Sequence, residues 1–179
     1  FTIVQIGRIT KIKNPDMLVE TAKILESQIP EMRIKLVGDS VTVKDKLYKQ
    51  DLEKKIEEYG LSKIISFVGS VPNTEIRALY CQADITVNLT PTGGMDKVVL
   101  ESAASGVPVI STNETFKDFF VHESPQPSSK YHIYRIHVHK HIWPLKLNKS
   151  TSSQTTNLKS CKHFCKQDQK NMMSNHLLD

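Results

Sequence analysis

The sequence predicts an α/β domain with an open parallel sheet and helices on both faces. Over the first 111 residues, five short apolar runs alternate with longer segments that are amphipathic or rich in charge. This alternation is typical of βαβ units, whose right-handed crossovers place helices on both faces of a sheet. Gly7, Gly38 and Gly69 directly follow the first three apolar runs. Glycines thus cluster where the backbone would have to approach a ligand closely.

The expected strands are rich in β-branched and leucine side chains, which suits strands buried on both faces. In chain order they comprise residues 1–6, 32–37, 64–68, 83–89 and 108–111. Between them lie the expected helices, which comprise residues 15–29, 43–59, 73–81 and 97–105.

Turn and cap residues mark the ends of these helices. Asn14 is the expected N-cap of the first helix, with Pro15 in the first helical position. Asn73 is the expected N-cap of the third helix. Gly60 and Gly106 follow the second and fourth helices and predict their C-terminal stops.

The composition changes abruptly near residue 120. Residues 1–120 contain 15 Lys and Arg against 16 Asp and Glu, a net charge of −1, whereas residues 121–179 contain 9 against 3, a net charge of +6. All seven histidines follow residue 120, and all seven glycines and five alanines precede it. We therefore expect an α/β domain over residues 1–120 and a basic, poorly ordered tail rich in His, Lys and Ser over residues 121–179.

Several interpretations of the tail stay open. Residues 131–143 alternate apolar and polar side chains and predict one strand, whereas residues 148–175 are polar and typical of disorder. The tail could be a frameshifted or unspliced translation, or a basic extension that binds a membrane surface or nucleic acid. A metal site is a third alternative, built from His137, His139, His141, Cys161, His163 and Cys165. The frameshifted or unspliced translation is our first interpretation, and a solvated tail is favoured over a metal site.

Membrane insertion and secretion have no signal in the sequence. No apolar run approaches the roughly 18 residues that a membrane span needs, and the chain does not open with a signal-peptide pattern. The first residue, Phe1, lies inside an apolar run, which indicates that the sequence begins within a longer protein. We expect a cytoplasmic protein, with peripheral membrane association as an alternative. Because the positive charge belongs to the tail, no nucleic-acid partner is expected for the folded domain.

Candidate binding residues follow the first and fourth predicted strands. Ligands of open parallel sheets bind beyond the carboxyl ends of the strands. Arg8, Lys11 and Lys13 lie in the segment between the first strand and a helix N-terminus, where they would suit a diphosphate; a loop of solvated cations is equally compatible with this spacing. Gly93 and Gly94 open the fourth helix and indicate either a second anion or sugar site or a plain turn.

Two further features narrow the class of ligand. The sequence has neither a G-x-G-x-x-G pattern nor a P-loop, so a nicotinamide or ATP site has no fingerprint here. Glu101 lies about one turn into an otherwise apolar helix. A carboxylate in such a place is costly unless it is paired or binds a ligand, and it could accept hydrogen bonds from the vicinal hydroxyls of a ribose or sugar. An exposed helical glutamate is the alternative.

Four stretches together carry a family resemblance. In order they read GRITKIKNPDMLVETAKIL, IKLVGDS, ISFVGSVPNTEIRALYCQADITVNLTPT and GGMDKVVLESAASGVPVIST. Residues 3–112 thereby resemble the C-terminal, donor-binding domain of a GT-B fold glycosyltransferase, of the retaining glycosyl transferases group 1 family. The resemblance ends before the tail, which has no family pattern.

The resemblance implies roles for individual residues. Arg8 and Lys13 match the pair that grips the donor diphosphate, and Glu101 matches the glutamate that binds the donor ribose. Gly69 and Val71 match the turn that lines the nucleobase pocket. The remaining matches belong to the loop that faces the donor sugar and phosphates, namely Gly93, Gly94, Met95 and Leu100. No catalytic residue and no metal ligand is assigned.

The sequence departs from the family at the start of the fourth helix. Gly93 occupies the place of the first glutamate of the family's E-x7-E motif, and Asp96 occupies a usual glycine position. Asp96 and Lys97 are the neighbouring residues that could substitute for the missing carboxylate. The family's N-terminal Rossmann-like domain, which binds the acceptor, is an expected partner that the 179 residues do not include.

The resemblance implies transfer of a sugar from a nucleotide-diphosphate sugar to an acceptor that stays open. Arg8 and Lys13 would stabilise the leaving diphosphate, so no metal or other cofactor is expected. The isolated chain is expected to be inactive because half of the cleft is absent. A non-catalytic nucleotide-binding α/β module, favoured by Gly93, is the main alternative, and nucleic-acid binding through the tail is another.

Overall fold

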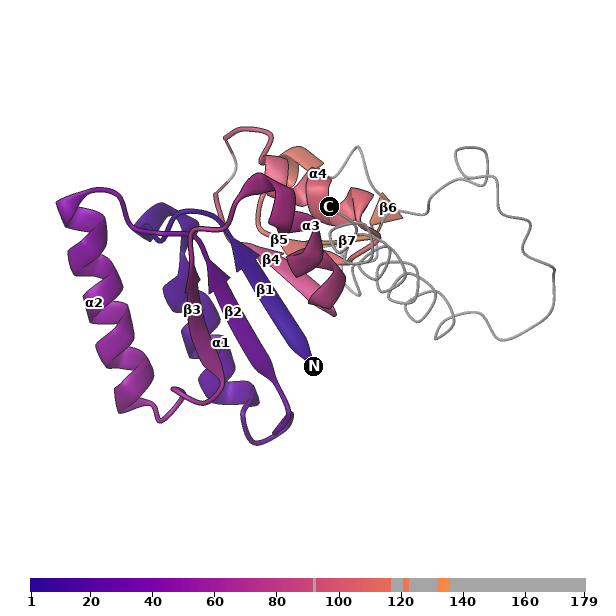
Figure 1. The fold of residues 1–179 in the computed structure, drawn as a ribbon. Coiled ribbons are helices and arrows are strands. Elements are labelled where there is room, and N and C mark those ends of the chain that lie inside the picture. The colour runs from indigo at the N-terminus through magenta and orange to yellow at the C-terminus, as the bar shows by residue number, and fades with distance from the viewer. Residues whose placement is uncertain (92, 117–120, 123–131, 136–179) are drawn as a thin grey trace, which may run out of the picture.

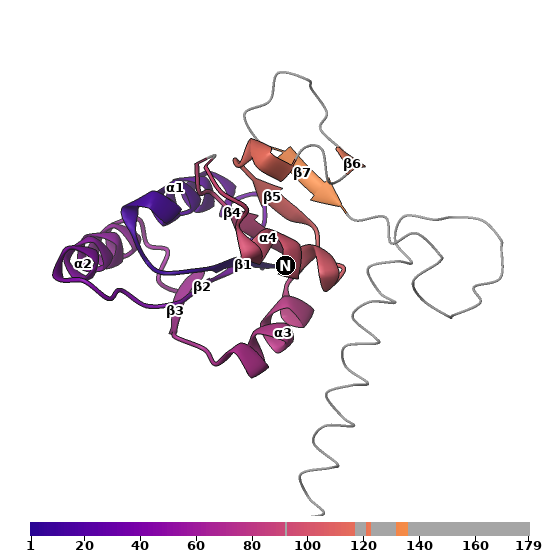
Figure 2. The same cartoon turned by 90° about the horizontal axis from the view of Figure 1, so that it is seen from above.

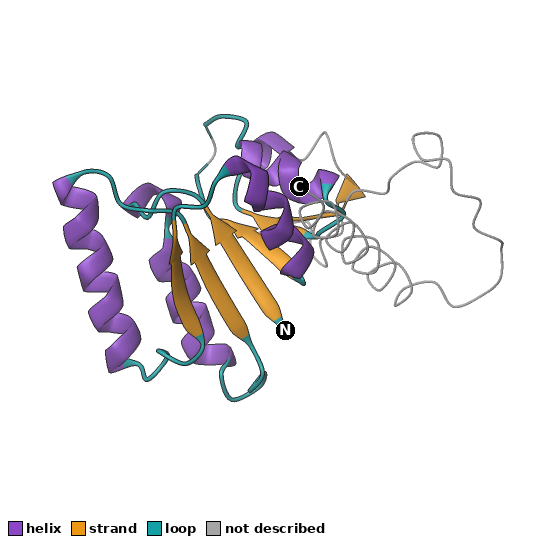
Figure 3. Cartoon of the chain, viewed as in Figure 1, coloured by secondary structure: helices purple, strands orange, loops and turns teal. Residues whose placement is uncertain are grey.

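The computed structural model describes residues 1–91, 93–116, 121–122 and 132–135. The strands of this part of the chain form one sheet in the order β3-β2-β1-β4-β5-β7-β6 (Figures 1 and 3). In chain order they are β1 (Thr2–Ile6), β2 (Arg33–Val37), β3 (Ile65–Gly69), β4 (Ile85–Asn88), β5 (Val109–Ser111), β6 (Val121–His122) and β7 (His132–Arg135). The first five are parallel, which confirms the predicted open α/β sheet.

The sequence predicts a parallel sheet, but the observed sheet also contains two antiparallel pairings. β7 pairs antiparallel with β5, with Ile133 opposite Ile110, and β6 pairs antiparallel with β7. The edge of β5 offers unpaired backbone groups, and a returning chain can pair with them antiparallel without a crossover helix. The sheet therefore continues past residue 120. The tail interpretations that rest on residues 136–179 lie outside the described residues.

The helices cover both faces of the sheet, as predicted (Figure 2). They are α1 (Pro15–Leu25), α2 (Val43–Glu58), α3 (Asn73–Gln82) and α4 (Lys97–Ala104), with short 3-10 turns η1 (Lys11–Lys13) and η2 (Glu114–Phe116). α1 and α2 lie on one face and α3 and α4 on the other. None of the described helices is both long and apolar enough to cross a membrane.

Each face of the sheet has its own core. Leu18 of α1 and Leu52 of α2 join a cluster with Ile34 and Leu36 of β2, all nearly inaccessible to solvent. On the opposite face, Tyr80 of α3 lies in a cluster with strand residues Val4 and Val37. α4 packs through its buried Val99 against Val109 of β5 and Phe116. Its buried Ser102 hydroxyl also lies 2.5 Å from the Thr86 hydroxyl of β4 and donates to the Val107 carbonyl at 3.0 Å.

The helix ends agree with the sequence except at the N-terminus of α3. Gly60 and Gly106 follow α2 and α4 with φ of 73° and 70°, which confirms them as stops. Asn14 precedes α1 in a left-handed conformation but its side chain makes no cap hydrogen bond, and its amide faces the Met17 sulfur instead. Asn73 is the first helical residue of α3, because the extended Pro72 takes the cap position. Asn14 therefore occupies the predicted N-cap position, with Pro15 first in the helix, although its side chain makes no cap hydrogen bond. The prediction of Asn73 as an N-cap was wrong by one residue.

The chain order determines where the two halves of the sheet meet. The chain moves outward from β1 to β2 and β3 through α1 and α2, and then returns past β1 to β4 and β5 through α3 and α4. The strand order reverses between β1 and β4. In open α/β sheets, ligands bind beyond the carboxyl ends of the strands at such a point. The segments that follow β1 and β4 therefore form the candidate site.

Candidate functional site

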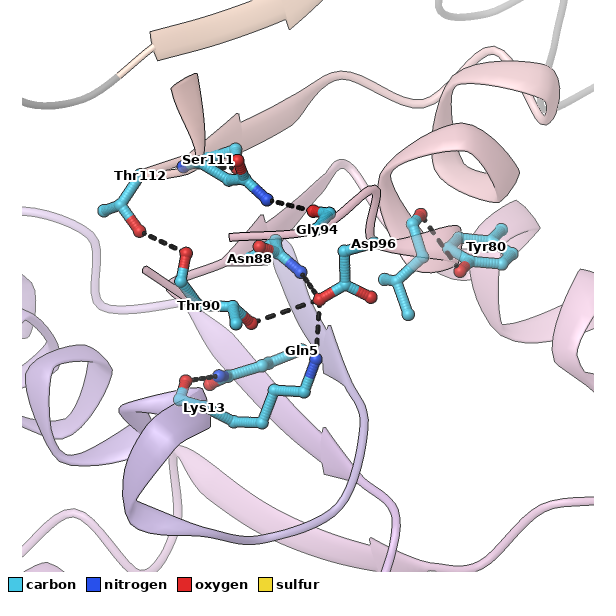
Figure 4. A network of polar contacts seen from close by, with 11 residues as sticks. Gln5, Lys13, Tyr80, Asn88, Thr90, Gly94, Asp96, Ser111 and Thr112 are labelled. Carbon is cyan, nitrogen blue, oxygen red and sulfur yellow. Dashed lines mark hydrogen bonds and ion pairs between the residues drawn. The ribbon is translucent and has the colours of Figure 1, made fainter. Parts of the chain in front are cut away.

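Three side chains converge on one carboxylate oxygen between the ends of β1 and β4 (Figure 4). The Oδ2 atom of Asp96 accepts hydrogen bonds from Lys13 Nζ at 2.6 Å, from Asn88 Nδ2 at 2.7 Å and from Thr90 Oγ1 at 3.1 Å. Lys13 follows β1, whereas Asn88, Thr90 and Asp96 belong to β4 and the loop after it. The contact between Lys13 and Asp96 therefore joins the two halves of the sheet at the reversal point.

β1 supplies the support for Lys13. Gln5 projects from β1, is 7% exposed, and donates from Nε2 to the Lys13 carbonyl at 2.7 Å. The Lys13 amide donates to the Thr10 carbonyl at 3.1 Å and closes the η1 turn. The backbone of Lys13 is thus tied to β1 by hydrogen bonds, and this limits how far its ammonium group can move.

β5 supplies the support for the loop after β4. Asn113 donates from Nδ2 to the Gly94 carbonyl at 2.7 Å, and Thr112 donates from Oγ1 to the Thr90 carbonyl at 3.0 Å. Both donors directly follow β5. These bonds fix the path of the loop at two points before α4 begins, and so place Asp96 beside Lys13.

Asp96 is held in its charged form. Its side chain is 14% exposed, and this burial by itself would raise its pKa. The hydrogen bonds from Lys13, Asn88 and Thr90, together with the positive charge of Lys13, outweigh burial and lower the pKa of Asp96 from its ordinary value. At neutral pH the Asp96 carboxylate and the Lys13 ammonium therefore form an ion pair in direct contact.

Glu101 has a separate set of partners on α3 and α4. Tyr80, which is buried, donates its hydroxyl to Glu101 Oε2 at 3.1 Å, and Lys97 Nζ lies 3.0 Å from Glu101 Oε1. Burial and then the negative charge of Glu101 raise the pKa of Tyr80, so the phenol remains a donor. Glu101 is therefore a paired, partly exposed carboxylate with a fixed orientation.

The structure brings some of the predicted site residues together and leaves others apart. Lys13 lies against the loop that contains Gly93 and Gly94, through its contact with Asp96. Arg8 is exposed, and within the described ranges its guanidinium makes no ion pair. Met95 and Leu100 are 52% and 37% exposed, on the loop and on the first turn of α4.

The predicted nucleobase residues lie farther along the same edge of the sheet. Gly69 ends β3, and its carbonyl accepts the Gly38 amide at 2.8 Å. Val71 is partly buried and packs against the cluster that contains Val4, Val37 and Tyr80. Two strands, β2 and β1, separate β3 from β4. Gly69 and Val71 therefore share the carboxyl edge with Lys13 but not its immediate surroundings.

Sequence reasoning missed three residues that shape the site: Gln5, Tyr80 and Asn88. Gln5 and Asn88 are polar residues inside otherwise apolar strands, at or near the carboxyl end, and that pattern could have identified them. In the part of the chain that the structure describes, Gln5 Oε1 and Asn88 Oδ1 are buried without a hydrogen-bond partner. Tyr80 gave no such signal because an apolar helix face readily contains tyrosine.

The described residues contain no candidate metal site. Among the residues whose positions are described, no group of three or more His, Cys, Asp and Glu side chains is arranged to hold a metal ion. The histidines and cysteines of the proposed tail site fall outside those residues.

Known proteins resemble part of this chain. A family model described as Glycosyl transferases group 1 matches residues 1–124. The chain is 29% identical to D-inositol 3-phosphate glycosyltransferase from Corynebacterium urealyticum over 110 residues, which cover 60% of this chain and 26% of that protein. It is 28% identical to alpha-monoglucosyldiacylglycerol synthase from Acholeplasma laidlawii over 123 residues, which cover 69% of this chain and 29% of that protein. The chain thus spans less than a third of either relative.

Solved structures share the fold. The C-terminal domain of a glycosyl transferase group 1 family protein (LpcC) from Francisella tularensis matches with a TM-score of 0.62 and 29% identity, covering 68% of this chain and 63% of that chain. Anabaena Alr3699/HepE in complex with UDP-glucose matches with a TM-score of 0.57 and 21% identity, covering 62% of this chain and 29% of that chain. The family model spans more than half of the sequence, and the chain therefore belongs to the glycosyl transferases group 1 family.

Proposed function

We propose that this chain is the donor-binding part of an enzyme that transfers a sugar from a nucleoside-diphosphate sugar to an acceptor. The observation that carries the proposal is the position of Lys13 at the point where the strand order reverses, beside a glycine-containing loop and the start of α4. A cation and a helix N-terminus at such a point suit a diphosphate. Family membership supports a transferase, and the structural neighbour in complex with UDP-glucose supports a nucleotide-sugar donor.

In this proposal, residues at the carboxyl edge of the sheet each bind a different part of the donor. Lys13 and the exposed Arg8 bind the diphosphate, and Glu101, oriented by Tyr80, accepts hydrogen bonds from the ribose hydroxyls. Gly69 and Val71 line the base, and the loop of Gly93, Gly94 and Met95, with Leu100, faces the sugar and phosphates.

The chemistry depends on charge that grows on the leaving group. As the bond between the anomeric carbon and the diphosphate breaks, negative charge accumulates on the diphosphate oxygens. Cations aimed at those oxygens stabilise the transition state more than the ground state. Arg8 and Lys13 supply such cations, so we propose transfer without a metal. Retention of configuration is an expectation of the family.

Donor binding is tested by titrating the 179-residue chain with UDP-glucose in a calorimeter. Arg8→Ala should weaken binding by roughly 10- to 100-fold, because a charge-assisted contact is worth about 1.5–3 kcal/mol. Arg33→Ala is the matched control: Arg33 is exposed at the amino end of β2, and among the described residues its side chain bonds only to the neighbouring Met32 carbonyl. Equal losses in both variants, or none in Arg8→Ala, would contradict the assignment.

A second candidate function is a nucleotide-binding module without catalysis. It is favoured by Gly93, where the family has a carboxylate and where an added Cβ would meet no described atom within 4 Å. Titration with UDP and with UDP-glucose separates the two functions. Tighter binding of UDP-glucose indicates a site that recognises the sugar, whereas equal affinities indicate a module that recognises only the nucleotide. Because the chain matches about a quarter of its relatives' length, we expect binding without turnover in either case.

A further inference from the structure

The place beside Lys13 where we propose that a diphosphate binds already contains an anion of this chain, the Asp96 carboxylate. Asp96 Oδ2 takes one charged and two neutral hydrogen bonds, from Lys13, Asn88 and Thr90, at 2.6 to 3.1 Å. A phosphate oxygen bound at the same place would seek the same kinds of donor. Figure 4 shows these donors directed at the carboxylate from both sides of the strand reversal.

The pair is sheltered enough for its charges to matter. The side chains of Lys13 and Asp96 are 23% and 14% exposed. Charges screened only weakly by water interact more strongly than surface pairs do. A diphosphate that approached Lys13 would meet the negative charge of Asp96 within a few ångströms, and it could use Lys13 fully only after the ion pair had opened.

The Asp96 carboxylate does not hydrogen-bond to the first turn of α4. Asp96 occupies the N-cap position of α4, but its side chain makes no cap hydrogen bond. Its polar contacts go instead to Lys13, Asn88 and Thr90. Replacing the carboxylate should therefore release Lys13 while α4 begins where it does now.

We propose that Asp96 is a specificity-determining residue that competes with the diphosphate of a bound donor for Lys13. This inference rests on the proposed function in one respect, the use of Lys13 as a diphosphate ligand. Asp96 lowers affinity for ligands whose recognition depends on a densely charged diphosphate. Selectivity among ligands then depends more on the ribose, which binds Glu101, and on the base, which binds at the end of β3.

The test measures binding of inorganic pyrophosphate to the full 179-residue chain by calorimetry. Pyrophosphate presents the diphosphate charge without a base, ribose or sugar. Asp96→Asn and Asp96→Gly should each bind pyrophosphate at least tenfold more tightly than the wild type, a difference of about 1.4 kcal/mol. Asp51→Asn is the charge-matched control, since Asp51 is an exposed residue of α2. It should leave the affinity unchanged.

Further variants show whether the gain acts through Lys13. Adding Lys13→Ala to Asp96→Gly should abolish the tighter binding. Circular dichroism and thermal unfolding establish that each variant is folded, and two substitutions at residue 96 guard against one that misfolds. The inference is overturned if the variants bind pyrophosphate no more tightly than the wild type, if Asp51→Asn gains equally, or if the gain survives the loss of Lys13.

The outcomes separate this inference from the proposed function. If pyrophosphate binds more tightly to both Asp96 variants while UDP-glucose binds to none of the proteins, Asp96 competes for Lys13 as inferred and the donor assignment fails. In the opposite case, UDP-glucose binds the wild type, Arg8→Ala weakens that binding, and pyrophosphate binds the Asp96 variants no more tightly than the wild type. The donor assignment then stands, and Asp96 does not compete for Lys13.

Discussion

Gly38 allows the ends of β1 and β2 to approach each other at the edge that forms the site. Its φ of 130° lies in a region that side chains rarely adopt, and a Cβ built on it would fall 2.1 Å from the Gly7 carbonyl oxygen. The Gly7 amide in turn donates to the Val37 carbonyl at 2.8 Å. Any larger residue would push apart the two loops that present Arg8 and Asp39.

Gly38→Ala should therefore destabilise the protein. Backbone strain of this kind costs on the order of 1–3 kcal/mol, and the clash with a backbone atom adds to it. Gly60→Ala is the matched control, since Gly60 also has a positive φ, 73°, but an added Cβ meets no described atom within 4 Å. Urea unfolding should show a larger loss for Gly38→Ala. Equal losses would mean that the loops at the edge relax without difficulty.

Asp96 makes stability depend on pH in a defined direction. Its pKa in the folded protein is lowered from its ordinary value, so the unfolded chain takes up the proton first as the pH falls. Its contribution is therefore complete above about pH 4 and is lost as the pH falls through the lowered pKa. Urea unfolding at several pH values should show the wild type more stable than Asp96→Asn near pH 6, with the difference shrinking toward pH 3. A difference that stays constant would contradict the ion pair.

At the scale of elements, α3 and α4 act together to orient Glu101. The Tyr80 hydroxyl of α3 reaches Glu101 Oε2 at 3.1 Å and the Val98 carbonyl at 3.3 Å. α4 itself is held to β4 through Ser102 and Thr86. The carboxylate is therefore positioned by a helix that contributes no proposed ligand of its own.

Tyr80→Phe should loosen Glu101 and weaken recognition of the ribose. We expect a loss of about 1 kcal/mol in stability and a fall of roughly fivefold in UDP affinity. The affinity for 2′,3′-dideoxy-UDP, which lacks the ribose hydroxyls, should hardly change. Tyr59→Phe is the control, because the Tyr59 hydroxyl bonds to Glu20 on α1. A parallel loss for both nucleotides would show that Tyr80 acts only through stability.

At the scale of the whole molecule, the sheet is completed by a strand from beyond the α/β repeat. β7 covers the edge of β5 in an antiparallel pairing centred on Ile110 and Ile133. Without it, β5 would present unpaired backbone groups, and such edges favour aggregation.

Ile133→Pro should uncover that edge, because proline cannot donate its backbone hydrogen bond in the ladder. We expect a lower unfolding midpoint and more aggregation by light scattering, whereas Ile133→Val should resemble the wild type. Unchanged stability of the proline variant would show that the sheet does not depend on β7.

Much of the fold was predictable because its causes are local. The apolar runs of residues 32–37 and 64–68 correspond to β2 and β3 within one or two residues. Gly60 and Gly106 stop helices because their own backbone favours the required conformation. The N-caps were less predictable: Asn14 occupies its predicted position without a side-chain cap hydrogen bond, and Pro72 takes the position expected for Asn73.

The sequence by itself determined the order of strands and helices, the family and the position of Lys13 after the first strand. Only the tertiary structure decided that Lys13 meets Asp96, a residue 83 positions away. The physical reason is the adjacency of β1 and β4. A local pattern specifies a strand, whereas the neighbour of that strand depends on crossovers and on packing across the whole sheet. The same adjacency brings Gln5 and Asn88 to one corner and makes an internal carboxylate the partner of a proposed phosphate ligand.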